Sequence, residues 1–172
     1  MCRNQTENGD LPSVSETIIK LLAEMEKHYE DKNNKYFENL LNYPNHIIRT
    51  RAVCILADIA AEDSIESLSN VLKHDSDALV RHEAAFSLGQ LGFESGLEPL
   101  LQAVESDPSF FVRHEAAIAL GVIGSEKARA TLTDALHDLS EEVRGSALVA
   151  LANLEYISTI KRKNKFTKMT GG

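Results

Sequence analysis

The chain has 172 residues, with 18 Lys and Arg against 26 Asp and Glu, which gives a formal net charge of −8 at pH 7. This charge argues against a general nucleic-acid binder, because such proteins need a basic surface to displace phosphate counterions. Aromatic residues make up 6% of the chain and Trp does not occur. The core is therefore expected to consist of small aliphatic side chains, and an aromatic ligand cage is disfavoured.

The expected cellular location follows from the cysteines and from the apolar runs. Cys2 and Cys54 are too few for a disulfide framework and favour a reducing compartment. No stretch approaches the roughly 18 consecutive apolar residues of a membrane span, and the first dozen residues lack the apolar centre of a signal peptide. We expect a cytoplasmic protein without a nucleic-acid or membrane partner. Cys54 lies in an apolar run and is expected to be a buried structural thiol.

Taken in chain order, the sequence predicts two terminal tails around a single domain, 13–160. Residues 1–12 are polar and are expected to form a disordered tail. Residues 13–30 combine a capping-box pattern with apolar residues at helical spacing, which predicts a helix that caps the array. Residues 33–42 supply the first helix of the first repeat. Residues 161–172 are expected to form a basic, flexible tail.

Four related segments decide the fold class. They are IRTRAVCILADIA from Ile48, VRHEAAFSLGQLG from Val80, VRHEAAIALGVIG from Val112 and VRGSALVALANL from Val143, and their starts are 32, 32 and 31 residues apart. Such a period, with apolar residues at three-and-four spacing, is typical of stacked helical hairpins. The sequence therefore predicts an all-α fold, an α-solenoid of about four hairpins over residues 33–154.

Each quoted segment is the second helix of a hairpin, and residues 64–74, 96–106 and 126–138 supply the first helices of the later hairpins. Short acidic turns join the two helices, and the residues expected to cap or open the second helix are Asp77 or Ser76, Ser109 or Pro108, and Ser140. Gly92 and Gly124 are expected to end two second helices in the left-handed conformation. An arginine recurs near the start of every segment, at Arg49, Arg81, Arg113 and Arg144. A structural ladder between these arginines and the acidic turns is favoured over an anion site.

Two consecutive repeats carry an identical His-Glu pair, His82-Glu83 and His114-Glu115. Equivalent positions on neighbouring second helices lie roughly 8 to 10 Å apart, so these side chains can meet on one rim of the stack. Imidazoles and carboxylates form a reasonable ligand set for iron or manganese, and zinc is not excluded. The flanking repeats have other residues at these positions, so the repeat fold itself does not require His-Glu.

The pattern in VRHEAAFSLGQLG and VRHEAAIALGVIG resembles the HEAT-type repeats of phycobilisome lyases and deoxyhypusine hydroxylases. The resemblance to the hydroxylases implies that the His-Glu pairs are iron ligands, because each half of those proteins holds two such motifs. This chain is similar to one half. A di-iron centre would then need a homodimer whose motif-bearing faces oppose each other across a two-fold axis.

The resemblance also implies that the protein is an iron-dependent oxygenase or hydroxylase that uses dioxygen. His82 and His114 are the expected ligands, and Glu83 and Glu115 either ligate the metal, bridge it or hold a cationic substrate amine as catalytic residues. An acidic protein suits a basic protein or amine substrate.

Two other interpretations remain open. The His and Glu side chains are filler near a helix N-terminus if the two repeats are recent copies of each other. The protein is then a non-enzymatic HEAT-repeat binding scaffold or a relative of the bilin lyases. Phe110 and Phe111, at the start of one second helix, either form an apolar wall beside the motif or pack against the next repeat, and packing is favoured.

Overall fold

The structure is a computed structural model that describes residues 16–162. The expected tail 1–12, the first residues of the expected capping helix, 13–15, and residues 163–172 lie outside this range. The helices are α1 (Glu16–Glu30), α2 (Asn34–Leu40), α3 (His46–Ala60), α4 (Ile65–His74), α5 (Ala78–Leu91), α6 (Leu97–Ser106), α7 (Phe110–Ile123), α8 (Arg129–Ala135) and α9 (Glu141–Arg162). Short 3₁₀ helices η1 (Ala61–Ser64), η2 (Glu94–Gly96) and η3 (Glu126–Ala128) precede α4, α6 and α8.

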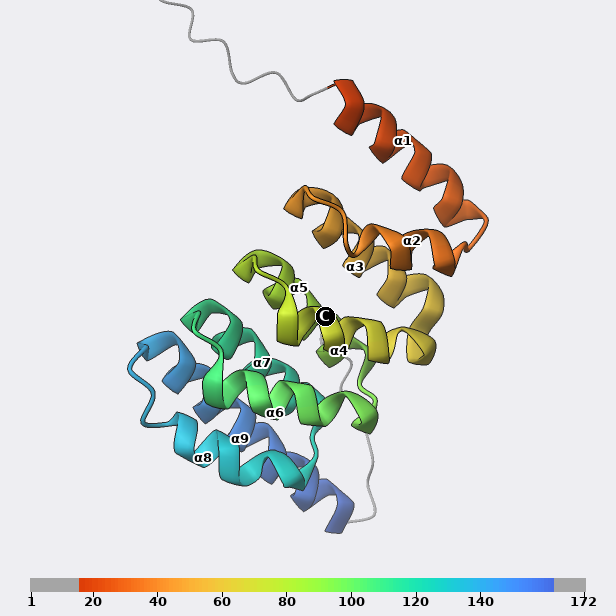
Figure 1. Cartoon of the computed structure of the whole chain (residues 1–172). Helices are drawn as coiled ribbons and strands as arrows, with labels where there is room; N and C mark the ends of the chain where they lie inside the picture. Colours follow the sequence, from red (N-terminus) through yellow and green to blue (C-terminus); the bar gives the residue numbers. More distant parts are fainter. Residues whose placement is uncertain (1–15, 163–172) are drawn as a thin grey trace, which may run out of the picture.

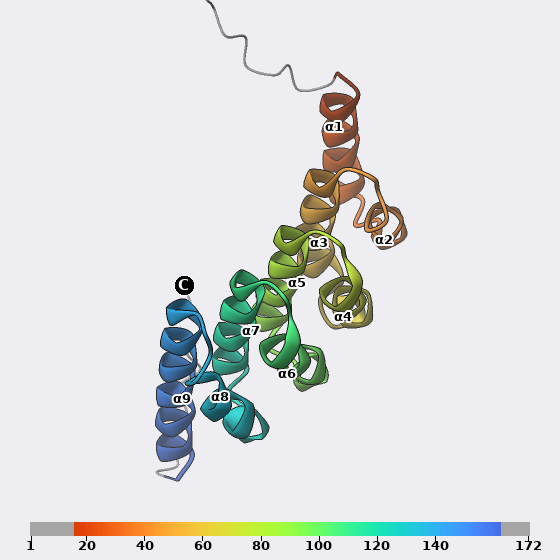
Figure 2. The same ribbon diagram turned by 60° about the vertical axis from the view of Figure 1, so that its left-hand side comes forward.

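The helices pair into four hairpins, α2/α3, α4/α5, α6/α7 and α8/α9. Figure 2 shows the second helices α3, α5, α7 and α9 side by side in one row and the first helices in another. Helix α1 packs at the α3 end of the stack, where Met25 is fully buried with Phe37 and Ile48. Because the described residues contain helices and no strand, the prediction of an all-α solenoid with an N-terminal helix is confirmed.

The predicted capping residues are confirmed at Asp77, Gly92 and Gly124, whereas Ser109 begins α7 without a side-chain hydrogen bond to the helix amides. Asp77 accepts a hydrogen bond from the amide of Leu79 at 2.8 Å and begins α5. Gly92 and Gly124 end α5 and α7 with φ of 70° and 68°, the left-handed region predicted for them. Helix α9 continues through residues 161 and 162, which were expected to begin the basic tail. No proline or glycine interrupts this last stretch, so the helix propagates to Arg162.

Small residues allow the second helices to approach one another closely. A Cβ atom placed on Gly89 would lie 2.7 Å from Cβ of Ala119, and one on Gly121 would lie 2.8 Å from Cβ of Ala150. These distances are shorter than van der Waals contact, so glycine is required where α5 crosses α7 and where α7 crosses α9. The repeated Ala and Gly of the sequence segments therefore set the spacing of the row.

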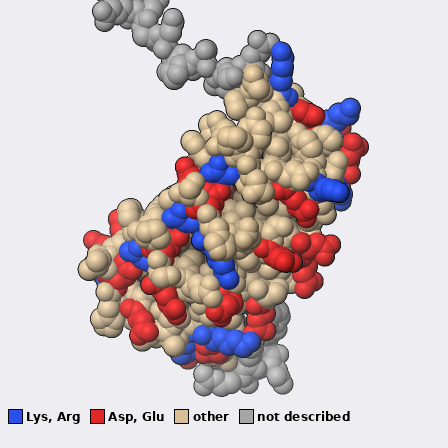
Figure 3. All heavy atoms as spheres, viewed as in Figure 1, with Lys and Arg blue, Asp and Glu red and all other residues tan. Residues whose placement is uncertain are grey.

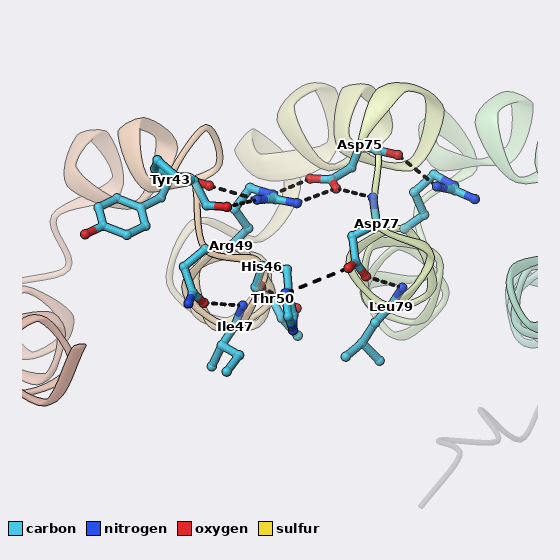
Figure 4. A network of polar contacts seen from close by, with 11 residues as sticks. Tyr43, His46, Ile47, Arg49, Thr50, Asp75, Asp77 and Leu79 are labelled. Carbon is cyan, nitrogen blue, oxygen red and sulfur yellow. Dashed lines mark hydrogen bonds and ion pairs between the residues drawn. The ribbon is translucent and has the colours of Figure 1, made fainter. Parts of the chain in front are cut away.

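The predicted arginine ladder is present near the N-terminal ends of α3, α5 and α7. Arg49 donates two hydrogen bonds to Asp75, of 2.7 and 2.8 Å, and a third to the carbonyl of Tyr43 (Figure 4). Arg81 and Arg113 repeat this pattern with Asp107 and Asp138. Each of these three arginines thus ties its second helix to the turn of the following repeat, which confirms the structural role. Arg144 of the last hairpin instead donates to the carbonyl oxygens of Asp138 and Leu139 in the turn before α9.

On the face seen in Figure 3, the described Lys and Arg side chains are interspersed with Asp and Glu and do not form one basic patch. Within residues 16–162, no helix is long and apolar enough to cross a membrane.

Candidate functional site

The first contact of the site joins the two central repeats. His82 lies in the second turn of α5 and Glu115 in the second turn of α7, and the Nε2 and Oε2 atoms are 3.3 Å apart. Both side chains are largely buried, with exposed fractions of 18% for His82 and 11% for Glu115. The prediction that motif residues of neighbouring second helices meet is correct for this pair.

The ring of His82 is fixed from a second direction. Phe111 of α7 stacks on it, with the ring centroids 3.9 Å apart and the planes within 7° of parallel. Phe111 remains 39% exposed, and its stacking on His82 gives the apolar wall beside the motif that was one of the two interpretations of this residue. The Nδ1 atom of His82 is buried and has no hydrogen-bond partner within the described residues.

His114 is oriented by the last repeat. Its Nδ1 atom lies 2.7 Å from Oγ of Ser146, and that hydroxyl donates to the carbonyl oxygen of Glu142 at 2.9 Å. Because the hydroxyl proton is used in this bond, Nδ1 of His114 donates to Ser146 and Nε2 carries the lone pair. A histidine held through its Nδ1–H is the usual arrangement of a metal ligand.

Glu83 has a different partner, Cys54 of α3, whose Sγ donates to Oε1 of Glu83 at 3.0 Å. Cys54 is exposed as a residue, and the prediction of a buried thiol was therefore wrong. Its sulfur is nevertheless partly desolvated. This desolvation, followed by the hydrogen bond to Glu83 and the negative charge of that carboxylate, raises the pKa of the thiol to about 12.

The three contacts follow one rule. Each joins a second helix to the Glu position of the next second helix, in the pairs Cys54–Glu83, His82–Glu115 and His114–Ser146. The four predicted site residues therefore make separate pairwise contacts along the row of second helices, which we call the His-Glu ladder. They do not converge on one point. In residues 16–162, no group of three or more His, Cys, Asp and Glu side chains is placed to hold a metal ion. Imidazole and carboxylate donors suit iron, but the closest contact within one chain, between His82 and Glu115, supplies only two donors.

A row of exposed apolar residues lies beside these contacts, and it was not predicted from the sequence. Phe86 and Ile118 are 43% and 36% exposed and occupy the repeat position of Cys54, and Val149 occupies the same position on α9. The signal was available in the register of 32, 32 and 31 residues, which aligns these four positions. A cavity of about 520 Å³ opens beside this surface, and its lining includes Leu22, Tyr29, Arg51, Cys54 and Leu79.

The sequence itself matches a known family over this architecture. The sequence model for HEAT repeats matches residues 3–89 and 65–152. The chain belongs to the HEAT-repeat family. No curated protein matches it.

Among solved structures, this HEAT-repeat protein is similar to human deoxyhypusine hydroxylase in complex with glycerol. The TM-score is 0.65 and the sequence identity 24%, over 88% of this chain and 50% of that chain. At this identity the likeness shows the shared fold. The described HEAT-repeat protein thus corresponds to half the length of the hydroxylase.

Proposed function

We propose that this HEAT-repeat protein binds iron through its His-Glu motifs and acts as a metal-dependent hydroxylase whose site is completed in a homodimer. The observation that carries the proposal is the contact between His82 and Glu115, which brings an imidazole and a carboxylate from two consecutive repeats to 3.3 Å. The orientation of His114 by Ser146 supports it, because that bond leaves Nε2 as a ligand atom. The structural likeness to a hydroxylase agrees with this assignment.

The donor types of these residues suit iron, and a second copy of the chain would supply the further ligands that a complete site needs. Imidazole and carboxylate donors suit iron, with Mn or Zn as competitors. A complete site for one or two metal ions needs more ligands than the pair found in one chain, and a two-fold axis duplicates His82, His114 and Glu115. The chain covers half of the hydroxylase to which it is similar, which is consistent with two copies replacing two halves.

The bound iron would supply activation of dioxygen, and the protein residues would position the substrate. Insertion of one oxygen atom into a C–H bond reduces the other atom to water and consumes two electrons and two protons, so an external reductant is required. Glu83 presents a half-buried carboxylate, whose present donor is a weak thiol. We assign it to the cationic group of an amine or of a basic protein substrate. The neighbouring cavity has room for the apolar part of such a substrate.

The test is the metal content and molar mass of protein purified without added metal, before and after anaerobic incubation with ferrous iron. We expect about one iron per chain in a dimer, and loss of iron in His82→Ala and His114→Ala with unchanged circular dichroism. His137→Ala is the matched control, because this exposed histidine lies outside the ladder. Protein that stays metal-free after incubation with ferrous iron would contradict the proposal.

A second function, a binding scaffold or a relative of the bilin lyases, is favoured by the exposed row of Phe86, Ile118 and Val149. Such a row is a common feature of protein or ligand contact surfaces. If the protein is metal-free, a titration with a linear tetrapyrrole, followed by absorbance, distinguishes a binding scaffold from a relative of the bilin lyases. Only the lyase-like protein should shift the absorbance of the pigment.

A further inference from the structure

The cavity of about 520 Å³ lies where α1 meets the row of second helices. Its apolar wall includes Leu22 of α1, Ile47 and Ile55 of α3 and Leu79 of α5. The volume is within the range of about 300–1,000 Å³ that is usual for small-molecule sites, which are mostly apolar and carry a few polar groups that fix the ligand. The polar groups at the edge of this cavity therefore decide which ligand suits it.

Arg51, at the edge of the cavity, has hydrogen-bond donors that the protein does not use. It pairs with Glu26 through Nη2, and this pair is exposed, with exposed fractions of 44% for Arg51 and 60% for Glu26. Its Nε and Nη1 atoms donate to no acceptor within the described residues, whereas Arg49 on the same helix uses Nε, Nη1 and Nη2. A guanidinium with unused N–H groups can bind a carboxylate through two parallel hydrogen bonds.

Glu83 supplies the opposite charge beside the same edge. Its half-buried carboxylate accepts a hydrogen bond from Sγ of Cys54 at 3.0 Å and has no cationic partner within residues 16–162. Cys54 lines the cavity and lies three residues after Arg51, so these two side chains share one side of α3. A guanidinium and a carboxylate thus flank one thiol without forming an ion pair with each other.

We propose that this edge of the cavity binds a free α-amino acid with an apolar side chain. Arg51 binds the carboxylate of the ligand, Glu83 binds its ammonium group in place of the thiol of Cys54, and the apolar side chain fills the cavity. An α-amino acid carries both charges on one carbon, which suits two charged groups that flank a single side chain. Its ammonium group is also a stronger donor to the half-buried carboxylate than a thiol is.

This ligand narrows the substrate class of the proposed function, in which Glu83 holds a cationic group. A lysine side chain of a protein would bring a cation for Glu83 but no carboxylate for Arg51, so the two charges together favour a small zwitterion. The inference rests on the proposed function where it makes the amino acid the substrate. Binding itself uses neither His82 nor Glu115 and so needs no metal.

Isothermal titration calorimetry of the full-length protein, freed of metal by a chelator, tests the site with L-phenylalanine, L-leucine and L-methionine. The tightest binder is then compared with its analogues that lack the amine or the carboxylate, which for phenylalanine are hydrocinnamate and phenethylamine. Each analogue should bind at least about tenfold more weakly, because each loses one pair of charge-assisted hydrogen bonds. Absence of binding by all three amino acids at millimolar concentration would overturn the proposal.

Two variants assign the two charges. Arg51→Gln should weaken binding of the amino acid and of the acid analogue and leave the amine analogue unchanged. Glu83→Gln should weaken binding of the amino acid and of the amine analogue and leave the acid analogue unchanged. Arg129→Gln is the matched control, because Arg129 pairs with Glu126 at a similar exposure, 41% and 58%, and does not line the cavity. A variant with unchanged circular dichroism that weakens all three ligands equally would overturn the assigned contacts.

The outcomes separate this site from the metal chemistry. A protein that binds an apolar amino acid but stays free of iron would support the site and contradict the proposed hydroxylase. A protein that binds iron but none of the three amino acids would overturn the site and leave the proposed hydroxylase standing.

Discussion

Arg81 on α5 binds Asp107, in the turn after α6, through two parallel hydrogen bonds of 2.8 and 2.9 Å. Both side chains are more than nine-tenths buried. Arg81→Ala would leave the Asp107 carboxylate without its bidentate donor and the carbonyl of Asp75 without the 2.8 Å bond from Arg81. We expect the free energy of unfolding in urea to fall by about 3 kcal/mol, the cost of removing one partner of a buried ion pair. Arg129→Ala, which breaks an exposed pair with Glu126, is the control and should change stability little.

The arginine–aspartate pairs also predict that the stability of the fold depends on pH under acidic conditions. The hydrogen bonds from Arg113 lower the pKa of Asp138 below its ordinary value, an effect that outweighs partial burial of the carboxylate. Because the folded pKa is depressed, the stabilisation is fully present above the unfolded value of about 3.9 and is lost as the pH falls through the folded pKa. Urea unfolding measured from about pH 6 to about pH 3 should show a weaker loss of stability in Asp138→Asn than in the wild type. Equal acid slopes in the two proteins would refute this role.

Glycine substitutions should have opposite effects at two positions of the second helices. Gly121→Ala places a Cβ 2.8 Å from Cβ of Ala150 and should destabilise the fold by about 1–3 kcal/mol, less the gain in helix propensity. Gly145→Ala meets no atom within 4 Å and should stabilise α9 by up to about 1 kcal/mol. Thermal unfolding followed by circular dichroism measures both. A stabilising Gly121→Ala would show that α7 and α9 can separate without cost.

The thiol of Cys54 should react slowly. A pKa of about 12 leaves it protonated at neutral pH, and the thiolate is the reactive form. Glu83→Gln removes the negative charge that opposes ionisation, so the rate of reaction with a disulfide reagent should rise. The comparison is made in a Cys2→Ser background, in which Cys54 is the remaining cysteine. The pKa read from the pH dependence of the rate should fall in Glu83→Gln, and an unchanged value would exclude Glu83 as a cause.

Local sequence predicted the fold well because each repeat contacts mainly its neighbours. The capping by Asp77, the left-handed Gly92 and Gly124 and the arginine ladder all depend on residues within one repeat or the next. The ends of the helices were less predictable. The segment 126–138 forms a 3₁₀ turn followed by the short helix Arg129–Ala135, because the chain enters the hairpin through a tight turn before the regular helix begins.

The period of the sequence alone determined that His82, Glu83, His114 and Glu115 lie along one row of helices, since equivalent positions of a regular stack must align. Only the tertiary structure decided which of them touch. The pairings His82–Glu115, His114–Ser146 and Cys54–Glu83 depend on the offset between neighbouring helices, which is set by the close approach of Gly89 to Ala119 and of Gly121 to Ala150. Side-chain contact requires placement to within about 0.5 Å, and a repeat period does not specify position at that scale.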